Sequence, residues 1–326
     1  MDKEELNEDV EENLAQIAVR GSLGDLYSGR QETQRSAGGS GQKEITSLVD
    51  RFHYPVHGPG MMWETLARQL LSQGQEVRLE SEVVRLNHEA SRITSAVVRK
   101  PDGSTEEISG LHFISSIPLR SLVRRLHPSA PDEIRASAER LHYRDFLTVG
   151  VIVNRPHLFP DNWIYIHAPD VRVSRVQNYK NWHPEMCANP AKTNLGLEYF
   201  CFQGDELWGA SDAELGDLAK RELDSLGLAS YADCEETLVI RAPKAYPVYD
   251  SDYAKHLPIL KDYLAGFVNL QLIGRNGLHK YNNQDHSMYT ALLAARNILG
   301  AHYDLWSVNT EPEYLEENRL PRPEAS

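Results

Sequence analysis

The stretch "NLQLIGRNGLHKYNNQDHSMYTALLAARNILG", Asn269–Gly300, sets the order of elements near the end of the chain. Its first residues are short and mostly apolar, as expected for an interior strand. A run dense in hydrogen-bonding side chains follows and passes into an apolar-periodic stretch without a linker. The pattern therefore predicts a buried strand, a Gly-Arg pair, a polar loop and a helix.

The polar loop has the composition of a ligand-binding helix start. Gly274 allows a sharp turn or close backbone approach by a ligand, and Asp285 or Ser287 can cap the helix. A helix start presents free N–H groups that bind a phosphate or a polarised carbonyl oxygen, and Arg275 adds a planar cationic fork. The alternative is an ordinary capped helix after a surface loop. A strand-to-helix crossing at the carboxyl end of a sheet favours ligand binding.

Composition bounds the possible functions. The 326 residues are 41% apolar, enough for one large or two ordinary domains, and the formal net charge of −13 argues against a general nucleic-acid binder. The acidic N-terminus argues against a secretory signal, and no apolar run is long enough to span a membrane. Cys187, Cys201 and Cys234 lack disulfide or zinc spacing, which favours a reducing compartment and a cytoplasmic location.

Hydrophobic periodicity predicts a mixed architecture, α/β (α+β). Helices are expected within 61–74, 119–126, 132–141, 212–226 and 253–266 and after Asp285. Strands are expected at 76–86, 93–100, 104–109, 111–118, 145–154, 162–168, 171–179, 193–202, 237–243 and 269–274. Residues 1–44 are polar, and "SAGGSG" within them is typical of a flexible loop.

A second glycine-containing loop, "FHYPVHGPGMMWE" at Phe52–Glu64, also precedes a helix. Gly58 and Gly60 form a GxG, but Trp63 occupies the third glycine position and Pro55 interrupts the strand that should come before. From spacing alone, a Gly/Pro turn is the favoured interpretation. The sequence contains no convincing GxGxxG and no P-loop.

Candidate substrate residues lie in two further segments. Strand alternation places Arg175 and Tyr179 on one face, which suits an anionic or sugar-nucleotide ligand, although an exposed strand of an ordinary sheet has comparable weight. Tyr249 lies at a loop-to-helix entry, where buried packing is at least as common as ligand contact. Tyr281 is favoured because it belongs to the polar loop. No metal spacing or Ser/His/Asp order stands out.

Five segments together carry a family resemblance: "YPVHGPGMMWE", "NWIYIHAPDVRVSRVQNYKNW", "LGLEYFCFQGDELW", "APKAYPVYD" and "GRNGLHKYNNQDHSM". They resemble FAD-dependent oxidoreductases of the flavin amine oxidase superfamily. Within that superfamily, the similarity is greatest to the protoporphyrinogen-oxidase-like and UDP-galactopyranose-mutase-like members. The resemblance covers about Ile45 to Gly300. It does not specify one substrate.

The resemblance implies an extended FAD between two domains. Gly274 and Arg275 would approach its phosphates or ribitol, and the backbone of Val83 would meet the adenine. The helix start would lie under the flavin carbonyl, and the glycine loop would lie near the isoalloxazine ring. The remaining cofactor residues implied are Gly58, Gly60, Met61, Asp285, His286, Ser287 and Met288.

By the same resemblance, residues 45–128 and 267–302 form portions of an FAD-binding domain, 129–266 a substrate-binding domain and 303–326 a tail. The family's N-terminal Rossmann unit, with its GxGxxG, is expected to precede residue 1. The FAD-binding domain is therefore expected to be incomplete here, and a second chain supplying the missing unit is one expected partner.

Three functions follow from the resemblance. The first is hydride removal from a small-molecule substrate onto flavin N5, as in an amine oxidase. The second is a sugar-nucleotide mutase, in which reduced flavin attacks an anomeric carbon without net redox change. The third is a truncated, non-catalytic homologue or subunit. No catalytic residue and no metal is predicted.

Overall fold

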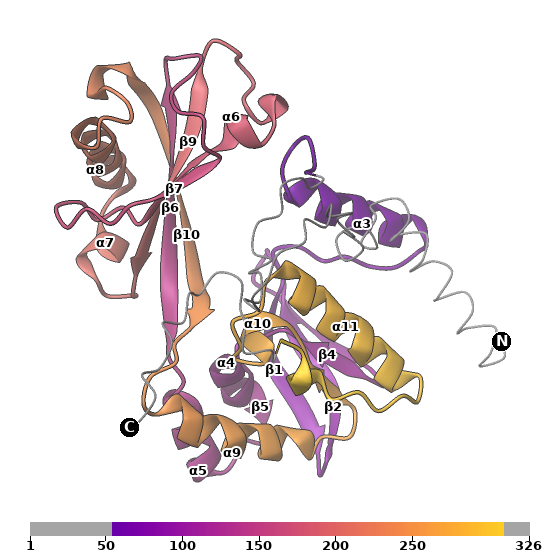
Figure 1. The fold of residues 1–326 in the computed structure, drawn as a ribbon. Coiled ribbons are helices and arrows are strands. Elements are labelled where there is room, and N and C mark those ends of the chain that lie inside the picture. Colours follow the sequence, from indigo (N-terminus) through magenta and orange to yellow (C-terminus); the bar gives the residue numbers. More distant parts are fainter. Residues whose placement is uncertain (1–53, 310–326) are drawn as a thin grey trace, which may run out of the picture. The chain divides into compact units, whose positions relative to one another are not determined.

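The computed structural model describes residues 54–309, and these form a mixed arrangement of helices and sheets, as predicted (Figure 1). The α-helices are α3 (Gly60–Ser72), α4 (Leu119–Arg125), α5 (Asp132–Glu139), α6 (Tyr179–Trp182), α7 (Glu206–Gly209), α8 (Asp212–Ser225), α9 (Tyr253–Ala265), α10 (Gly274–Gly277) and α11 (Gln284–Ile298). The strands are β1 (Glu82–Glu89), β2 (Arg92–Arg99), β3 (Thr105–Ser109), β4 (Phe113–Ser115), β5 (Leu126–His127), β6 (Tyr143–Val153), β7 (Trp163–Tyr165), β8 (Arg175–Asn178), β9 (Thr193–Cys201), β10 (Cys234–Pro247) and β11 (Leu270–Leu272).

Two small sheets share one core. The four-stranded sheet has the order β3-β2-β1-β5, and β11 pairs with β4 in a separate parallel pair. Leu86 and Ile93 from the larger sheet pack with Leu270 and Leu272 from the pair and with apolar residues of α4, α5 and α9. Alternation along these strands turns one side chain in two toward that core.

A buried amide joins the two sheets. Asn269 is 1% exposed, and its side chain accepts a hydrogen bond from the Ile93 N–H (2.9 Å) and donates to the Ile93 carbonyl (2.8 Å). It donates a second bond to the Leu111 carbonyl at 3.0 Å. The Asn269 side chain therefore makes the hydrogen bonds to the Ile93 backbone that a neighbouring strand would otherwise make.

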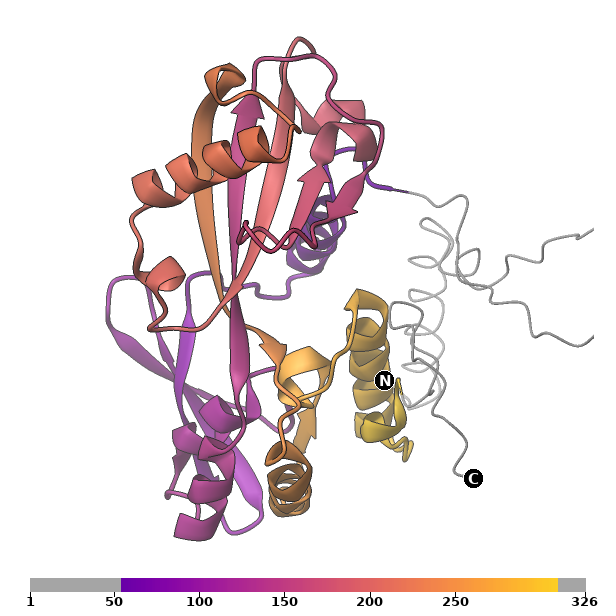
Figure 2. The same ribbon diagram turned by 60° about the vertical axis from the view of Figure 1, so that its left-hand side comes forward.

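The five-stranded sheet, β10-β6-β9-β8-β7, is antiparallel throughout. Odd-numbered residues of β6 from Leu147 to Val153 are buried against α8, whereas the even-numbered residues of the strand are less buried or exposed. Helix α8 lies across that buried face (Figure 2). Its Glu222 accepts hydrogen bonds from the Val173 N–H (3.1 Å) and the Tyr199 hydroxyl (3.0 Å), which anchors the helix.

Helix α3 ends as the sequence predicts. Gly74 has φ +78°, its N–H donates to the Leu71 carbonyl, and the Gln75 N–H donates to Leu70. This pair of bonds is the Schellman arrangement that a C′ glycine favours. No residue of α3 is buried, and Leu71 is 53% exposed.

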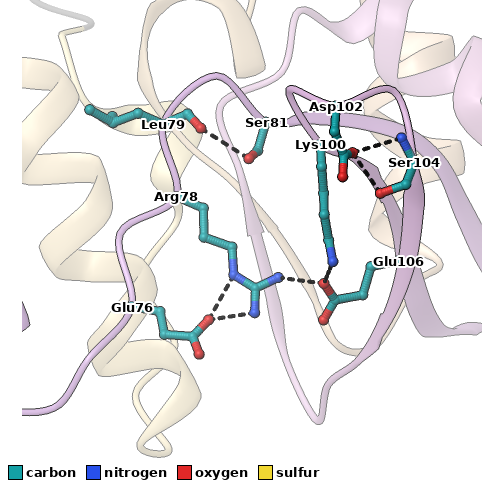
Figure 3. Close-up of polar contacts among 8 residues, drawn as sticks. All are labelled: Glu76, Arg78, Leu79, Ser81, Lys100, Asp102, Ser104 and Glu106. Atoms are coloured by element: carbon teal, nitrogen blue, oxygen red, sulfur yellow. Dashed lines mark hydrogen bonds and ion pairs between the residues drawn. The ribbon is translucent and has the colours of Figure 1, made fainter.

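The strand predicted from residue 76 begins only at Glu82. Figure 3 shows side-chain contacts in place of a ladder: Arg78 bridges Glu76 and Glu106, and Lys100 also reaches Glu106 at 2.7 Å. A turn at residues 101–103 joins β2 to β3, and the Asp102 carboxylate accepts hydrogen bonds from the Ser104 N–H and hydroxyl. These exposed contacts hold the segment beside the β2–β3 hairpin.

Candidate functional site

The carboxyl ends of β4 and β11 lie at one edge of their parallel pair. Leu272 is in register with Ser115, and Gly274 follows with φ +75°. A Cβ on Gly277 would lie 2.7 Å from the Ser115 carbonyl oxygen and 3.2 Å from the Ser116 Cα. Only glycine fits against this backbone, so α10 crosses directly over the end of β4.

Helix α11 begins at this edge. The Gly274 N–H donates to the Thr290 hydroxyl at 3.0 Å, and that hydroxyl donates to the Ser287 carbonyl at 2.7 Å. Thr290 is fully buried. The first turn of α11 is therefore fixed beside the end of β11. The Asn283 side chain caps the His286 N–H, whereas the two helix N–H groups before it have no partner within the helix and can receive an anion or a carbonyl oxygen.

The predicted cap of this helix is wrong. The N-cap is Asn283, whereas Asp285 and Ser287 lie inside the first turn. The Asn283 N–H donates to Nδ1 of His286 at 3.3 Å, and the same nitrogen lies 3.2 Å from the Asp285 carboxylate. Asp285, His286, Ser287 and Met288 do belong to the helix start, as expected, but Asn283 begins it.

Arg275 is held by neutral partners. Its guanidinium carbon lies 4.7 Å from the ring centroid of Tyr246 and 4.9 Å from that of Tyr281. Nε donates to the Asn282 carbonyl at 2.8 Å, and one terminal nitrogen donates to Ala245 at 3.1 Å. No carboxylate forms an ion pair with Arg275 within residues 54–309. Its charge is therefore oriented, and no carboxylate of the described residues neutralises it.

The tyrosines of the two loops come together. The Tyr281 N–H donates to the Tyr249 hydroxyl at 2.6 Å, and Tyr281 stacks with Tyr246 at 5.5 Å between centroids. Tyr249 stacks on Tyr253 at 4.6 Å and is 49% exposed. Two of the four predicted substrate residues, Tyr249 and Tyr281, thus share one cluster with Arg275.

Arg175 and Tyr179 lie together elsewhere, on the β8–β9 part of the five-stranded sheet. Arg175 donates to the buried Glu198 carboxylate at 2.6 Å. Tyr179 leaves the strand and begins α6, but a Cβ on Gly196 would lie only 2.2 Å from its hydroxyl. Residues 196 and 198 share a face of β9, so the predicted common face is correct. Strand alternation, the reason given for it, is wrong for Tyr179.

The glycine loop and Val83 lie on other elements. Gly58 has φ +85° and packs near Met186, while Gly60 begins α3 with no atom within 4 Å of its would-be Cβ. Met61 is 37% exposed. The Val83 carbonyl accepts from Nε of Arg125 at 2.6 Å, so this backbone oxygen already has a partner. The cofactor roles of these residues stay predictions.

An apolar surface opens on the sheet face opposite α8. Phe146, Phe200 and Tyr246 have mutual centroid distances of 5.5–6.0 Å. On the same face of the edge strand β10, Leu238 is 65% exposed and Ile240 56% exposed. Sequence reasoning missed this surface, although exposed apolar residues on one side of a sheet indicate a binding face.

His279 is another residue that the sequence did not single out. It is 1% exposed, its ring meets Tyr143 edge-on at 4.9 Å, and Nε2 lies 3.4 Å from the Val248 carbonyl. Burial lowers the pKa of His279 to about 4, partly offset by the Val248 carbonyl and Asp250. The imidazole is therefore neutral in the folded chain at pH 7.

This lowered pKa predicts acid sensitivity. Between pH 6.5 and 4 the unfolded chain binds a proton on His279, whereas the folded chain leaves this imidazole neutral. The free energy of unfolding should therefore fall as pH drops from about 6.5 to 4, by about 3 kcal/mol in total. Urea unfolding of wild type and His279→Phe across this range checks it. The phenylalanine variant keeps a ring but should lose this part of the pH dependence. Identical slopes in the two proteins would contradict the prediction.

The family model described as "Flavin containing amine oxidoreductase" matches residues 20–263 of the sequence. The chain belongs to this family of flavin-containing amine oxidoreductases. The family assignment confirms the resemblance, and the description of the family names a flavin. The matched residues end before Gly274, so the α10–α11 site rests on the structure.

Solved structures confirm the fold. Reduced UDP-galactopyranose mutase superposes with a TM-score of 0.67 at 20% identity, over 79% of this chain and 55% of that one. A putative protoporphyrinogen oxidase from Exiguobacterium gives 0.52 at 18% identity, over 74% and 50%. A putrescine oxidase mutant gives 0.50 at 14%, over 74% and 53%. A search of curated sequences found no significant match.

The chain spans about half the length of these solved structures. At such identities, the likeness establishes the fold alone. None of the helices in residues 54–309 has the length and apolar content needed to cross a bilayer. Within the same part of the chain, no cluster of His, Cys, Asp or Glu could hold a metal ion.

Proposed function

We propose that this chain binds FAD at the edge formed by β4, β11 and α11. The observation that carries the proposal is the oriented charge of Arg275, which forms no ion pair within residues 54–309, next to the first turn of α11. A cation and free helix N–H groups suit phosphate or a flavin carbonyl. The donors therefore fit the cofactor of the family, with Gly274 and Arg275 as its main contacts.

The proposed reaction is oxidation of a small molecule. FAD, when bound, accepts a hydride from a substrate C–H bond. Tyr246 and Tyr281 would present their rings to the substrate, and Phe146, Phe200 and Ile240 would exclude water along the open sheet face. We assign the four-stranded sheet β3-β2-β1-β5, the β4–β11 pair and α11 to cofactor binding. The five-stranded sheet is assigned to substrate binding.

A second candidate, a sugar-nucleotide mutase, has one observation in its favour. Arg175 lies over the Tyr165 ring at 5.6 Å, and Trp163 stacks on Trp182 at 5.1 Å. Trp163 and Tyr165 are both exposed. Exposed aromatic rings beside an arginine suit a nucleotide base and diphosphate. Turnover of a UDP-sugar only under reducing conditions would favour this candidate over the oxidase.

The visible spectrum of the purified full chain tests the proposal. We expect flavin absorption bands that stay with the protein through gel filtration, either as purified or after addition of FAD, because the α11 site orients a cation and free N–H groups toward the cofactor. A protein that stays colourless with excess FAD would contradict flavin binding by this chain alone. It would support the non-catalytic alternative.

A further inference from the structure

Lys244 adopts a backbone conformation that is unusual for a lysine. Ala242 of β10 pairs with Phe146 of β6, and Tyr246 pairs with Arg144, so residues 243–245 stand opposite Asp145 alone. Within this bulge Lys244 has φ +55°. Left-handed conformations are uncommon for side chains other than Gly, Asn and Asp, and bulges often re-aim a side chain near a functional site.

Buried polar groups fix this conformation on both sides. Asp145, 4% exposed, accepts from the Lys244 N–H at 2.7 Å and from the Gln203 N–H at 2.6 Å. The Asn276 side chain donates to the Lys244 carbonyl at 2.9 Å. Because both backbone groups are bound, the direction in which the lysine leaves the strand is determined.

The ammonium group reaches α4. Nζ of Lys244 donates to the Ser121 hydroxyl at 2.9 Å. No carboxylate of the described residues forms an ion pair with it. Burial lowers the pKa of Lys244, and the charges of Arg125, Arg120 and Arg124 lower it further.

The neighbouring arginines are better compensated than the lysine. Arg120 and Arg124 both contact Glu139, and Arg125 contacts Glu82 at 2.7 Å. Asp145 raises the pKa of Lys244, and its two oxygens already accept backbone N–H groups. Within residues 54–309, the half-buried ammonium group of Lys244 therefore lies near three guanidinium groups and has no carboxylate that neutralises its own charge.

A purely structural link to Ser121 would not need this charge, since a neutral side chain would avoid both the desolvation and the repulsion. We propose that Lys244 Nζ and Ser121 Oγ bind an oxyanion, phosphate or carboxylate. The site is two residues along β10 from Tyr246, which belongs to the proposed flavin site. The oxyanion would come from a substrate or from the cofactor's phosphates. Its binding as a free ion does not require flavin.

Sulfate and phosphate serve as probes on the full chain without added FAD. At constant ionic strength set with chloride, we expect either ion to raise the unfolding midpoint by about 3 °C at ten times its Kd. Lys244→Met should abolish the shift, since it removes the charge and keeps similar length. Lys255→Met, at an exposed lysine on α9, should keep it. Ser121→Ala should reduce the shift while Lys244 stays in place.

A wild-type protein that sulfate and phosphate stabilise no more than chloride would overturn the proposal. So would a Lys244→Met variant that keeps the full shift. An FAD titration of the same variants then separates the two sources. A roughly tenfold weaker FAD affinity in Lys244→Met assigns the oxyanion to the cofactor, and an unchanged affinity assigns it to a substrate. Failure to bind FAD at all would count against the flavin proposal only, because the anion assay omits flavin.

Discussion

Replacing Asn269 with alanine should lower the free energy of unfolding by about 3–4 kcal/mol. The substitution leaves the buried N–H and carbonyl of Ile93 without their side-chain partner, whereas the Leu111 carbonyl keeps a hydrogen bond from Arg92 at 3.2 Å. Each such orphaned group costs its desolvation free energy, and the side chain is too deep for water to replace it. Urea unfolding followed by circular dichroism measures the change.

Two further variants make this result specific. Asn269→Asp keeps an acceptor for the Ile93 N–H but loses both donors, so it should be at least as damaging near pH 7, where a buried carboxylate would face two carbonyls. Asn154→Ala, at an exposed asparagine after β6, should change stability by less than about 0.5 kcal/mol. A loss below about 1 kcal/mol for Asn269→Ala would show that the two sheets do not depend on this amide.

Arg275→Leu should weaken FAD binding by about 100-fold, which corresponds to about 2.7 kcal/mol. The variant loses the cation that contacts the stacked rings of Tyr246 and Tyr281, and the carbonyls of Ala245 and Asn282 lose their donor. The charge at the start of α11 and the position of the loop are both affected. Titration of the apoprotein with FAD, followed by flavin fluorescence, measures the Kd.

The size of this effect depends on the guanidinium fork, so Arg275→Lys should recover only part of the affinity. An ammonium keeps the charge but cannot contact both rings while donating to both carbonyls. Arg296→Leu, near the other end of α11, is the control and should leave the Kd unchanged. An unchanged Kd in Arg275→Leu, with a normally folded protein, would remove Arg275 from the proposed cofactor site.

The sequence predicted most elements because each carries its own periodicity. Strand β6 alternates along its whole length, and Gly74 ends α3 where a C′ glycine should. The start of β1 was not predictable in this way, because residues from 76 onward also alternate. Glu82 pairs with Arg99, the last residue of β2, so the length of the partner strand decides where β1 begins.

The cap of α11 shows the same limit. Asn283, Asp285 and Ser287 are all good N-cap residues by type. Asn282, just before them, is buried, and its carbonyl accepts the Arg275 side chain. This contact fixes the loop one residue before Asn283. A tertiary interaction therefore decides which of the three candidate residues caps the helix, because N-cap preference alone does not rank them.

The sequence by itself determined the order of strand, Gly-Arg, polar loop and helix, since those features depend on neighbours along the chain. Only the tertiary structure placed Arg275 against the stacked rings of Tyr246 and Tyr281 and brought Lys244 to Ser121. Tyr246 and Arg275 are 29 positions apart in the sequence, and Ser121 and Lys244 are 123 positions apart. Periodicity within a single element carries no information about such distances.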